Sequence, residues 1–221
     1  MAGQEARYRK KDIILGPGVN IYRTPLSGRN FEYMGEDPYL SSRMVVPYVK
    51  GMQQNGVAAC LKHFALNNQE KNRDKVNVEV SDRALYEIYL PAFKAGVQEG
   101  GVWAIMGSYN KYRGQCCSHH ERLVNQILKR DWGFDGVMLT DWGSAHDTDE
   151  AARNGLDLEM GTWTNGLTWG ISSAYDNYYL AQPFLKKIES GELPESLLDE
   201  KVRRVLRLCF RTNMNRNRPY G

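Results

Sequence analysis

Residues 136–143 read Gly-Val-Met-Leu-Thr-Asp-Trp-Gly, an apolar run that ends in a carboxylate, Asp141, and an aromatic side chain, Trp142. An apolar run of this length bounded by glycine is typical of a buried strand. In an α/β barrel, an acidic side chain at the carboxyl end of a strand lies at the rim where active sites form. For this segment alone, the favoured alternative is an Asp that caps the following helix. The rest of the sequence is needed to choose between the two.

Apolar runs of similar length occur at residues 12–15, 57–61, 102–106 and 156–160. Segments with helical spacing lie between them, notably residues 81–99, where Pro91 is expected to introduce a kink. This alternation predicts a parallel sheet with crossover helices. About five strand candidates are present where a closed barrel needs eight. We therefore expect an α/β fold, a partial (β/α) TIM-like barrel with mostly parallel strands and C-terminal helices.

The expected division places the partial barrel in residues 1–170 and a C-terminal helical segment with a basic tail in residues 171–221. Tyr175 and the tyrosines after it are expected to open a helix. Ser118 is expected to cap an earlier helix. The last helix, after Pro194, is expected to turn its apolar side chains inward: Leu197, Leu198, Val202, Val205, Leu206 and Cys209.

Composition excludes several classes of protein. The 221 residues are 42% hydrophobic and 25% charged, which are ordinary globular values and not those of disordered or collagen-like chains. No apolar run approaches the roughly 20 residues of a membrane helix, so no membrane partner is expected. The cysteines lack CxxC spacing and are expected to be free structural thiols: Cys60, Cys116, Cys117 and Cys209.

The end of the chain is strongly basic and carries no acidic residue. Such a tail can bind nucleic acid. The favoured interpretation is the solvated face of a terminal helix, so no nucleic-acid partner is expected. The basic residues are Lys201, Arg203, Arg204, Arg207, Arg211, Arg216 and Arg218.

Four further segments occur in order around the first one. They are Gly-Arg-Asn-Phe-Glu-Tyr-Met-Gly-Glu-Asp-Pro at 28–38, Leu-Lys-His-Phe-Ala-Leu-Asn-Asn-Gln-Glu at 61–70, Met-Gly-Ser-Tyr-Asn at 106–110 and Gly-Leu-Asp-Leu-Glu-Met at 155–160. Together with Thr-Asp-Trp at 140–142 they resemble the catalytic barrel of glycoside hydrolase family 3, on its β-glucosidase branch. The resemblance covers most of residues 3–160, and its motifs are long and specific.

The resemblance implies a retaining, exo-acting β-glycosidase of the β-glucosidase type that needs no cofactor. Its substrates would be terminal β-D-glucosyl residues of aryl glucosides, oligosaccharides or short β-glucans. The family's nucleophile falls on Asp141. Its sugar-binding residues fall on Arg29, Lys62, His63 and Tyr109, and Trp142 corresponds to an aromatic side chain beside the sugar.

Retaining hydrolysis uses two carboxyl groups roughly 5–5.5 Å apart. We expect a nearby lysine and arginine to keep the pKa of Asp141 low. From the residues alone, Arg29 could equally be held in a structural cluster of ion pairs. The remaining acidic residues of the motifs are expected to hold basic side chains in place rather than transfer protons: Glu36, Asp37, Glu70 and Asp157.

Two departures from the family pattern qualify the resemblance. Family β-glucosidases have a complete barrel followed by an α/β sandwich, whereas this sequence matches from partway through the barrel and ends before the sandwich. The family's acid/base Glu on the sandwich and a substrate-binding Asp in the first part of the barrel have no counterpart here. The alternative is therefore a non-catalytic carbohydrate-binding or assembly fragment. Because a partial sheet leaves apolar surface uncovered, we expect a homo-oligomer or complementation by the missing parent domain.

A metal site is a weaker alternative. His146, Asp147, Asp149 and Glu150 are crowded, but they lack a Cys or second His at zinc spacing. Acidic residues at the start of a helix are already explained by the helix dipole. No metal is expected.

Overall fold

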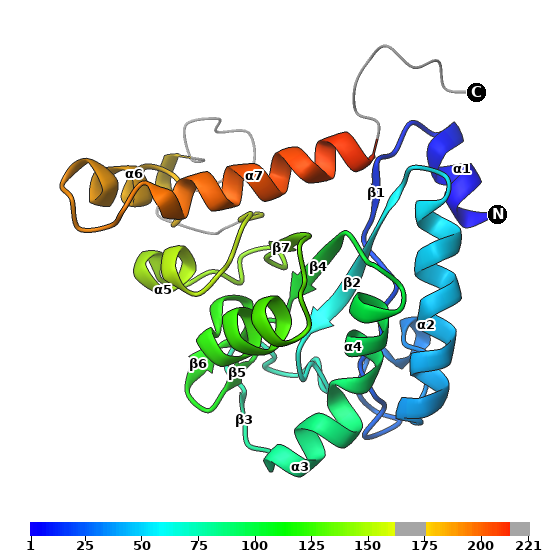
Figure 1. Cartoon of the computed structure of the whole chain (residues 1–221). Helices are drawn as coiled ribbons and strands as arrows, with labels where there is room; N and C mark the ends of the chain where they lie inside the picture. Colours follow the sequence, from blue (N-terminus) through cyan, green and yellow to red (C-terminus); the bar gives the residue numbers. More distant parts are fainter. Residues whose placement is uncertain (162–175, 213–221) are drawn as a thin grey trace.

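A parallel sheet of four strands forms the centre of the chain in the computed structural model, which describes residues 1–161 and 176–212 (Figure 1). The order is β1-β2-β4-β7, and every neighbouring pair is parallel. The sheet confirms the predicted architecture of parallel strands with crossover helices. The strands are β1 (Ile13–Ile14), β2 (Ala58–Phe64), β4 (Ala104–Gly107) and β7 (Val137–Leu139).

The fifth predicted strand, residues 156–160, pairs with β7 through a single parallel bridge between Leu139 and Leu158. The Thr140 amide donates to the Leu158 carbonyl oxygen, and the Leu158 amide donates to that of Met138, both at 3.1 Å. Over the described residues the sheet stays open, as expected for a partial (β/α) barrel.

The two faces of the sheet carry different apolar clusters. Ala59, Leu61, Ile105 and Met138 face the helices that connect the strands. The alternate residues face the other way and pack with Val205 and Leu208 of the last helix: Ala58, Cys60, Ala104, Met106, Val137 and Leu139. Because both faces are buried, the strands read as continuous apolar runs and not as alternating ones.

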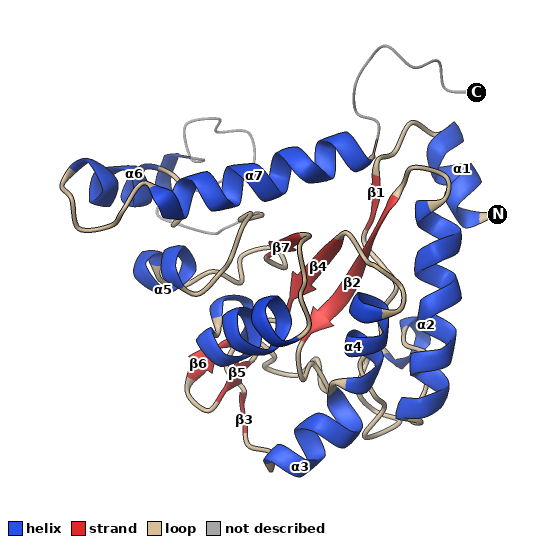
Figure 2. Ribbon diagram, viewed as in Figure 1, coloured by secondary structure: helices blue, strands red, loops and turns tan. Residues whose placement is uncertain are grey.

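The connecting helices lie along one side of the sheet (Figure 2). They are α2 (Pro38–Gln53), α4 (Pro91–Gln98) and the π-helical η4 (Glu121–Asp131), with α1 (Ala2–Tyr8) packed on α2. Asp37 caps α2 by accepting from the amides of Tyr39 and Leu40, so the prediction that Asp37 holds a basic side chain is wrong. The predicted cap at Ser118 is wrong as well, because the His120 ring accepts from the Leu123 amide.

The helix predicted over residues 81–99 is divided into three pieces. They are α3 (Asp82–Ala84), a π-helical turn η2 (Leu85–Tyr89) and α4, which begins at Pro91. Proline has no amide hydrogen to donate and is favoured in the first turn of a helix. Pro91 therefore starts a new helix, where a kink within one helix was predicted.

Short elements escaped prediction because two or three residues show no periodicity. Strands β3 (Asn77–Val78), β5 (Lys111–Tyr112) and β6 (Gln115–Cys116) form a second small sheet. The 3₁₀ turns η1 (Asn30–Glu32) and η3 (Cys117–His119) lie in connections. All four cysteines are free thiols, as predicted.

The C-terminal part consists of α5 (Thr148–Arg153), α6 (Gln182–Glu189) and α7 (Ser196–Arg211). The inward face predicted for α7 is wrong for Val202 and Leu206, which are 46% and 50% exposed. Its buried residues are instead Lys201 and Leu208. Tyr175, Arg216 and Arg218 lie outside the described residues. No helix within 1–161 and 176–212 has the length and apolarity to cross a bilayer.

Basic side chains fasten α7 to the rest of the fold. Lys201 Nζ donates to the carbonyl oxygens of Ala151, Ala152 and Leu156 at 3.3, 2.9 and 2.6 Å. Burial lowers the pKa of Lys201 to about 8. Arg211 binds Asp135 through two hydrogen bonds of 3.0 and 2.6 Å. The predicted solvated basic face is thus wrong for these two residues, which bind groups brought close by the fold.

Candidate active site

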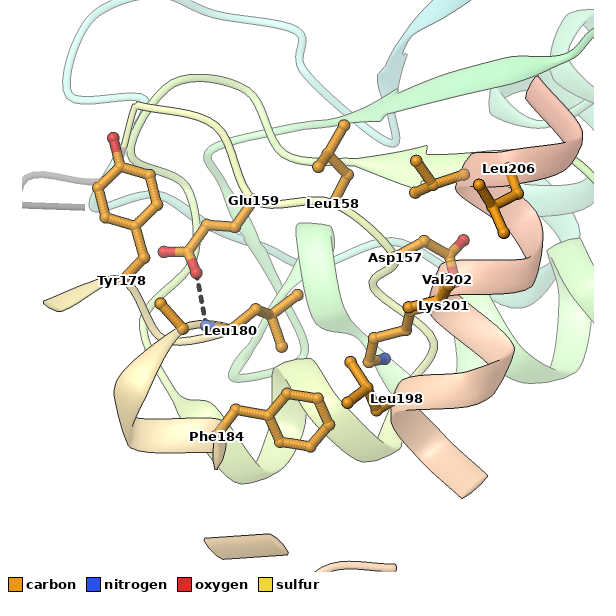
Figure 3. A pocket seen from close by; sticks show the side chains of 12 residues that line it. Asp157, Leu158, Glu159, Tyr178, Leu180, Phe184, Leu198, Lys201, Val202 and Leu206 are labelled. Atoms are coloured by element: carbon orange, nitrogen blue, oxygen red, sulfur yellow. Dashed lines mark hydrogen bonds between the residues drawn. The ribbon is translucent and has the colours of Figure 1, made fainter. Parts of the chain in front are cut away.

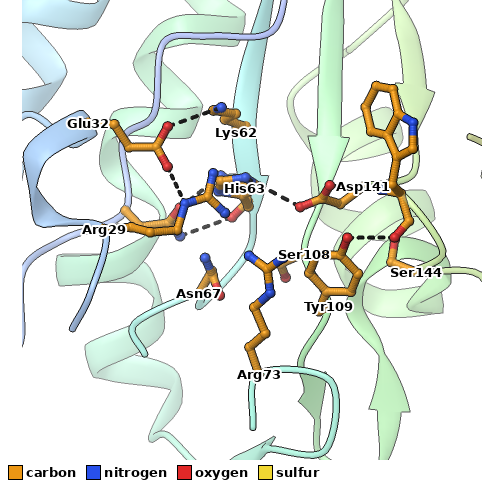
Figure 4. Close-up of polar contacts among 12 residues, drawn as sticks. Arg29, Glu32, Lys62, His63, Asn67, Arg73, Ser108, Tyr109, Asp141 and Ser144 are labelled. Atoms are coloured by element: carbon orange, nitrogen blue, oxygen red, sulfur yellow. Dashed lines mark hydrogen bonds and ion pairs between the residues drawn. The ribbon is translucent and has the colours of Figure 1, made fainter. Parts of the chain in front are cut away.

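The six residues predicted for the site lie together at the carboxyl end of the sheet (Figure 4). Lys62 and His63 belong to the last part of β2, Tyr109 follows β4, and Asp141 and Trp142 follow β7. Arg29 reaches the same place from the connection that precedes α2. Parallel strands bring their carboxyl ends to one edge, which is why residues far apart in sequence meet there.

Asp141 is 9% exposed and has a nitrogen atom near each carboxylate oxygen. The Trp142 amide donates to Oδ1 at 2.7 Å. His63 Nε2 lies 3.5 Å from Oδ2. The helix-capping alternative does not apply, because α5 is capped by Asp147, which accepts from the Glu150 amide at 2.8 Å.

The expectation that the pKa of Asp141 is low is wrong. Burial raises the pKa of this carboxyl above its ordinary value, and the Trp142 amide, Arg73 and Arg29 only partly oppose the rise. The Lys62 ammonium group is paired with Glu32 at 3.2 Å. Desolvation of a carboxylate therefore outweighs the positive charges around it.

His63 is fully enclosed, at 1% exposure. The side chain of Asn20 holds its backbone, accepting from the His63 amide at 2.8 Å and donating to its carbonyl oxygen at 3.0 Å. Burial, with Arg29 and Lys62 acting in the same direction, lowers the pKa of His63 to about 2. The imidazole is therefore neutral over the whole physiological range.

Glu32 organises the two basic residues on the other side of the site. It accepts from Arg29 Nε and pairs with Lys62, while Arg29 also lies 3.9 Å from Glu70. Burial lowers the pKa of Arg29, but the hydrogen bond to Glu32 and the nearby acidic groups together outweigh burial, so the pKa is raised. Both cations stay partly exposed, with 21% and 14% of their side-chain surface accessible. They can thus hold fixed positions and still offer donors to a ligand.

Arg73 belongs to the site and was not predicted. Its guanidinium pairs with Glu70 at 2.7 Å and lies 4.2 Å from the centre of the Tyr109 ring, a cation–π contact. No apolar run or repeated spacing marks Arg73 in the sequence, because it lies in an irregular loop. The sequence feature that came closest to indicating Arg73 was Glu70, which was correctly predicted to hold a basic side chain. Asp157, for which the same was predicted, holds Lys129.

Tyr109 and Trp142 form the aromatic side of the site. The Tyr109 hydroxyl donates to the Trp142 carbonyl oxygen at 2.5 Å, and burial raises the pKa of Tyr109 to about 12. Trp142 is 39% exposed. Its indole lies directly against Gly161, whose φ of +57° and lack of a side chain leave room for the ring. The arrangement leaves part of the indole available for stacking.

A hollow of about 290 Å³ lies under α7 and shares no residue with the polar cluster (Figure 3). Its lining is mainly apolar and includes Leu158, Phe184 and Val202. Glu159, on the same wall, accepts from the Leu180 amide at 2.7 Å.

The crowded acidic segment has structural partners. His119 Nδ1 lies 2.8 Å from Glu150, and Asp147 caps α5. Within the described parts of the chain, no group of three or more His, Cys, Asp or Glu side chains is arranged to hold a metal ion.

The chain is similar to members of one known protein family. The family described as "Glycosyl hydrolase family 3 N terminal domain" matches residues 1–208. Beta-glucosidase BoGH3A of Bacteroides ovatus is 63% identical over 219 residues, which are 99% of this chain and 29% of that protein. The exo-alpha-(1->6)-L-arabinopyranosidase of Bifidobacterium longum is 47% identical over 157 residues, 71% of this chain and 21% of that protein.

Among solved structures, beta-glucosidase 3B from Thermotoga neapolitana in complex with glycerol superimposes with a TM-score of 0.89 at 39% identity. That match covers 99% of this chain and 30% of the other. The same protein in complex with glucose gives a TM-score of 0.85 at 40% identity, covering 95% and 28% of the two chains. The chain therefore spans less than a third of the length of these relatives.

Proposed function

The chain belongs to glycosyl hydrolase family 3, and on that basis we propose that it supplies the nucleophile and part of the sugar-binding wall of a retaining, exo-acting β-glucosidase. One observation carries the proposal. Asp141 is buried beyond the end of β7, has a nitrogen atom near each carboxylate oxygen, and lies beside cations and aromatic rings. The β-glucosidases among its relatives share this part of the fold.

In the proposed reaction, the Asp141 carboxylate attacks the anomeric carbon of the terminal sugar. The bond between that carbon and the leaving-group oxygen breaks, and an acid protonates the oxygen. Water activated by the same group then attacks the anomeric carbon and releases Asp141. Two inversions give net retention of configuration.

We propose that the acid/base is a carboxyl group outside these 221 residues. Glu32 is engaged by Arg29 and Lys62, and Glu70 by Arg73, so neither is suited to donate a proton. Their role is to orient the cations. The comparison supports this division of labour, since the β-glucosidase relatives are more than three times as long as the chain.

The proposed substrates are terminal β-D-glucosyl residues of aryl glucosides, oligosaccharides or short β-glucans. Arg29 and Lys62 would donate to sugar hydroxyls, and Trp142 would stack on the ring, while the buried His63 would support the site from beside Asp141. An α-L-arabinopyranoside is the second candidate substrate, because a relative of that printed activity is 47% identical. Parallel assays with aryl derivatives of both sugars separate these possibilities.

The first prediction concerns the nucleophile. A 2-fluoro-glucoside with an activated leaving group reacts without an acid catalyst and should become attached to Asp141, as peptide mapping by mass spectrometry would show. Asp141→Asn should not be labelled, because an amide is a poor nucleophile. Asp131→Asn, on the surface, serves as the matched control and should label like wild type. Attachment to a different carboxylate would remove Asp141 from this role.

The alternative function is a non-catalytic carbohydrate-binding or assembly fragment, which the engagement of Glu32 and Glu70 favours. Assay of this chain on an aryl β-glucoside and on cellobiose distinguishes the two. Turnover of the aryl substrate alone indicates a nucleophile that works without its acid. Binding of glucose with no turnover and no labelling favours the alternative.

We further propose residues 1–170 as the partial barrel and 171–221 as its C-terminal helical segment. The open sheet and the exposed side of α7 would be covered by a second copy or by the rest of the parent protein.

A further inference from the structure

A continuous line of buried polar side chains runs from Asn67 to Asp141. Asn67 Nδ2 donates to the Tyr33 hydroxyl at 2.9 Å, and that hydroxyl lies 3.1 Å from His63 Nδ1. On the other side of the ring, His63 Nε2 lies 3.5 Å from Asp141 Oδ2. Tyr33, His63 and Asn67 are 7%, 1% and 2% exposed, so bulk water does not reach these groups.

The direction of the hydrogen bond between Tyr33 and His63 follows from the donors available. The Tyr33 hydroxyl has one proton and already accepts from Asn67. In the described part of the chain, His63 Nδ1 is the one acceptor in contact with that hydroxyl. Burial also raises the pKa of Tyr33, so the phenol keeps its proton. The hydroxyl must then donate, and Nδ1 must accept.

A neutral imidazole carries one N–H, so an accepting Nδ1 places the hydrogen on Nε2. Nε2 lies 3.5 Å from Asp141 Oδ2, longer than an ordinary N–H···O hydrogen bond, while the Trp142 amide donates to Oδ1 at 2.7 Å. The opposite tautomer would set a nitrogen lone pair against the carboxylate. The ring cannot readily turn away, because Asn20 holds the His63 backbone and Tyr33 packs on the imidazole edge-to-face at 6.1 Å.

We propose that Tyr33 is a positioning residue that fixes the tautomer of His63, so that the imidazole donates a hydrogen bond to Asp141. The proposal rests on the proposed role of Asp141 for its effect on reaction rate, whereas the tautomer itself is a property of the resting protein. In this role Tyr33 contacts His63 and not Asp141. It acts through His63.

The tautomer can be measured directly by ¹⁵N NMR of the full chain labelled with ¹⁵N-histidine, with His63→Gln to assign the signal. In wild type, His63 should show a protonated Nε2 and an unprotonated Nδ1. Asp141→Asn should keep that pattern, because Tyr33 still donates. Tyr33→Phe should give a mixture of tautomers or the Nδ1–H form. The matched control is Tyr112→Phe, which removes a buried hydroxyl that has no hydrogen-bond partner among the described residues, and it should leave His63 unchanged.

A wild-type His63 in the Nδ1–H form would overturn the proposal, as would an unaltered tautomer in Tyr33→Phe. The fluoro-sugar reaction provides the second readout. Tyr33→Phe should slow the labelling of Asp141 about ten- to a hundredfold, the range expected for one hydrogen bond to a charged group, and Tyr112→Phe should not. A changed tautomer with an unchanged labelling rate would refute the positioning role. Absence of labelling in wild type would count against the nucleophile alone and leave the NMR result standing.

Discussion

Two opposing influences act on the pKa of Asp141. Burial favours its neutral form, and the Trp142 amide, Arg73 and Arg29 favour its charged form. A nucleophilic carboxylate must be ionised, so the balance between these influences sets the lowest pH at which it works. Because burial wins, the acidic limit of the reaction should lie above the ordinary carboxyl pKa of about 3.9.

Removal of one of the cations near Asp141 should raise the acidic pH limit of the reaction further. Arg73→Met deletes a positive charge that lowers the pKa of Asp141, so the acidic limb of the labelling rate should shift to higher pH. Arg113→Met, at the exposed ion pair with Asp82, is the charge-matched control and should leave the limb in place. Labelling rates measured between pH 4 and 7 test the shift. Superimposable profiles for wild type and Arg73→Met would show that the guanidinium does not influence the nucleophile.

His63 makes the fold sensitive to acid. Its pKa is about 2 in the folded protein against the ordinary 6.5, so the unfolded chain binds a proton below pH 6.5 that the folded chain refuses. Its contribution to stability is therefore complete above pH 6.5 and is lost as the pH falls towards 2, with a slope of about 1.4 kcal/mol per pH unit for one proton. His63→Gln should flatten the dependence of the unfolding free energy on pH, measured by urea titration from pH 7 to 4.

The exposed His146 offers a comparison, and His146→Gln should change that slope less. Parallel stability curves for wild type and His63→Gln would contradict the prediction.

At the scale of elements, the apolar runs located the strands because both faces of the sheet are buried and each run is continuous. The candidate residues converged for the same reason: a parallel sheet gathers the carboxyl ends of its strands. Tyr33 and Arg73 were not predicted, since a phenol and a loop arginine carry no periodic signal. The pKa of Asp141 was misjudged because sequence shows which charges exist and not how much water is removed.

Helix α7 shows why the spacing of apolar residues did not predict which of its side chains are buried. Its apolar positions predicted an inward face, yet a lysine is buried on it, because carbonyl oxygens about 50 residues earlier in the chain surround the ammonium group. Those acceptors are set by tertiary structure. Val202 and Leu206 stay about half exposed because no element in the described part of the chain covers them fully.

The role of Lys201 is testable by a substitution that preserves its length. Lys201→Met leaves three carbonyl oxygens without their shared donor and should lower the free energy of unfolding by about 2–4 kcal/mol. Arg203→Met, on the exposed side of the same helix, should change it by less than about 0.5 kcal/mol. Urea denaturation of both variants provides the measurement. Equal stability of the two would mean that the carbonyl oxygens find water when the lysine is removed.

At the scale of the whole molecule, the open sheet and one side of α7, which borders the hollow under that helix, leave apolar surface in contact with solvent. Val202, Leu206 and Phe210 are 46%, 50% and 73% exposed and lie on the same helix. Contiguous apolar surface of this kind marks an interface. The chain alone is therefore expected to associate at micromolar concentration.

Leu206→Asp should keep the chain monomeric by light scattering and leave its unfolding free energy nearly unchanged, because the side chain is already half exposed. Leu208→Asp is the matched control two residues away. It places a charge at a position 4% exposed and should cost about 3 kcal/mol or more. A wild-type chain that is monomeric and melts cooperatively would show that the exposed side of α7 is not an interface.

The hydrogen bond between Arg7 and Thr212 can form only late in the synthesis of the chain. Arg7 donates to the Thr212 carbonyl oxygen at 2.9 Å across a separation of 205 residues. At roughly 5–20 residues per second, a ribosome completes Thr212 on the order of 10–40 s after Arg7. Strand pairing and helix packing are far faster than this interval. During synthesis, α1 can therefore pack on α2, and Arg7 can bind Asp12 and the carbonyl oxygens of Asn55 and Gly56, before the last turn of α7 has been made.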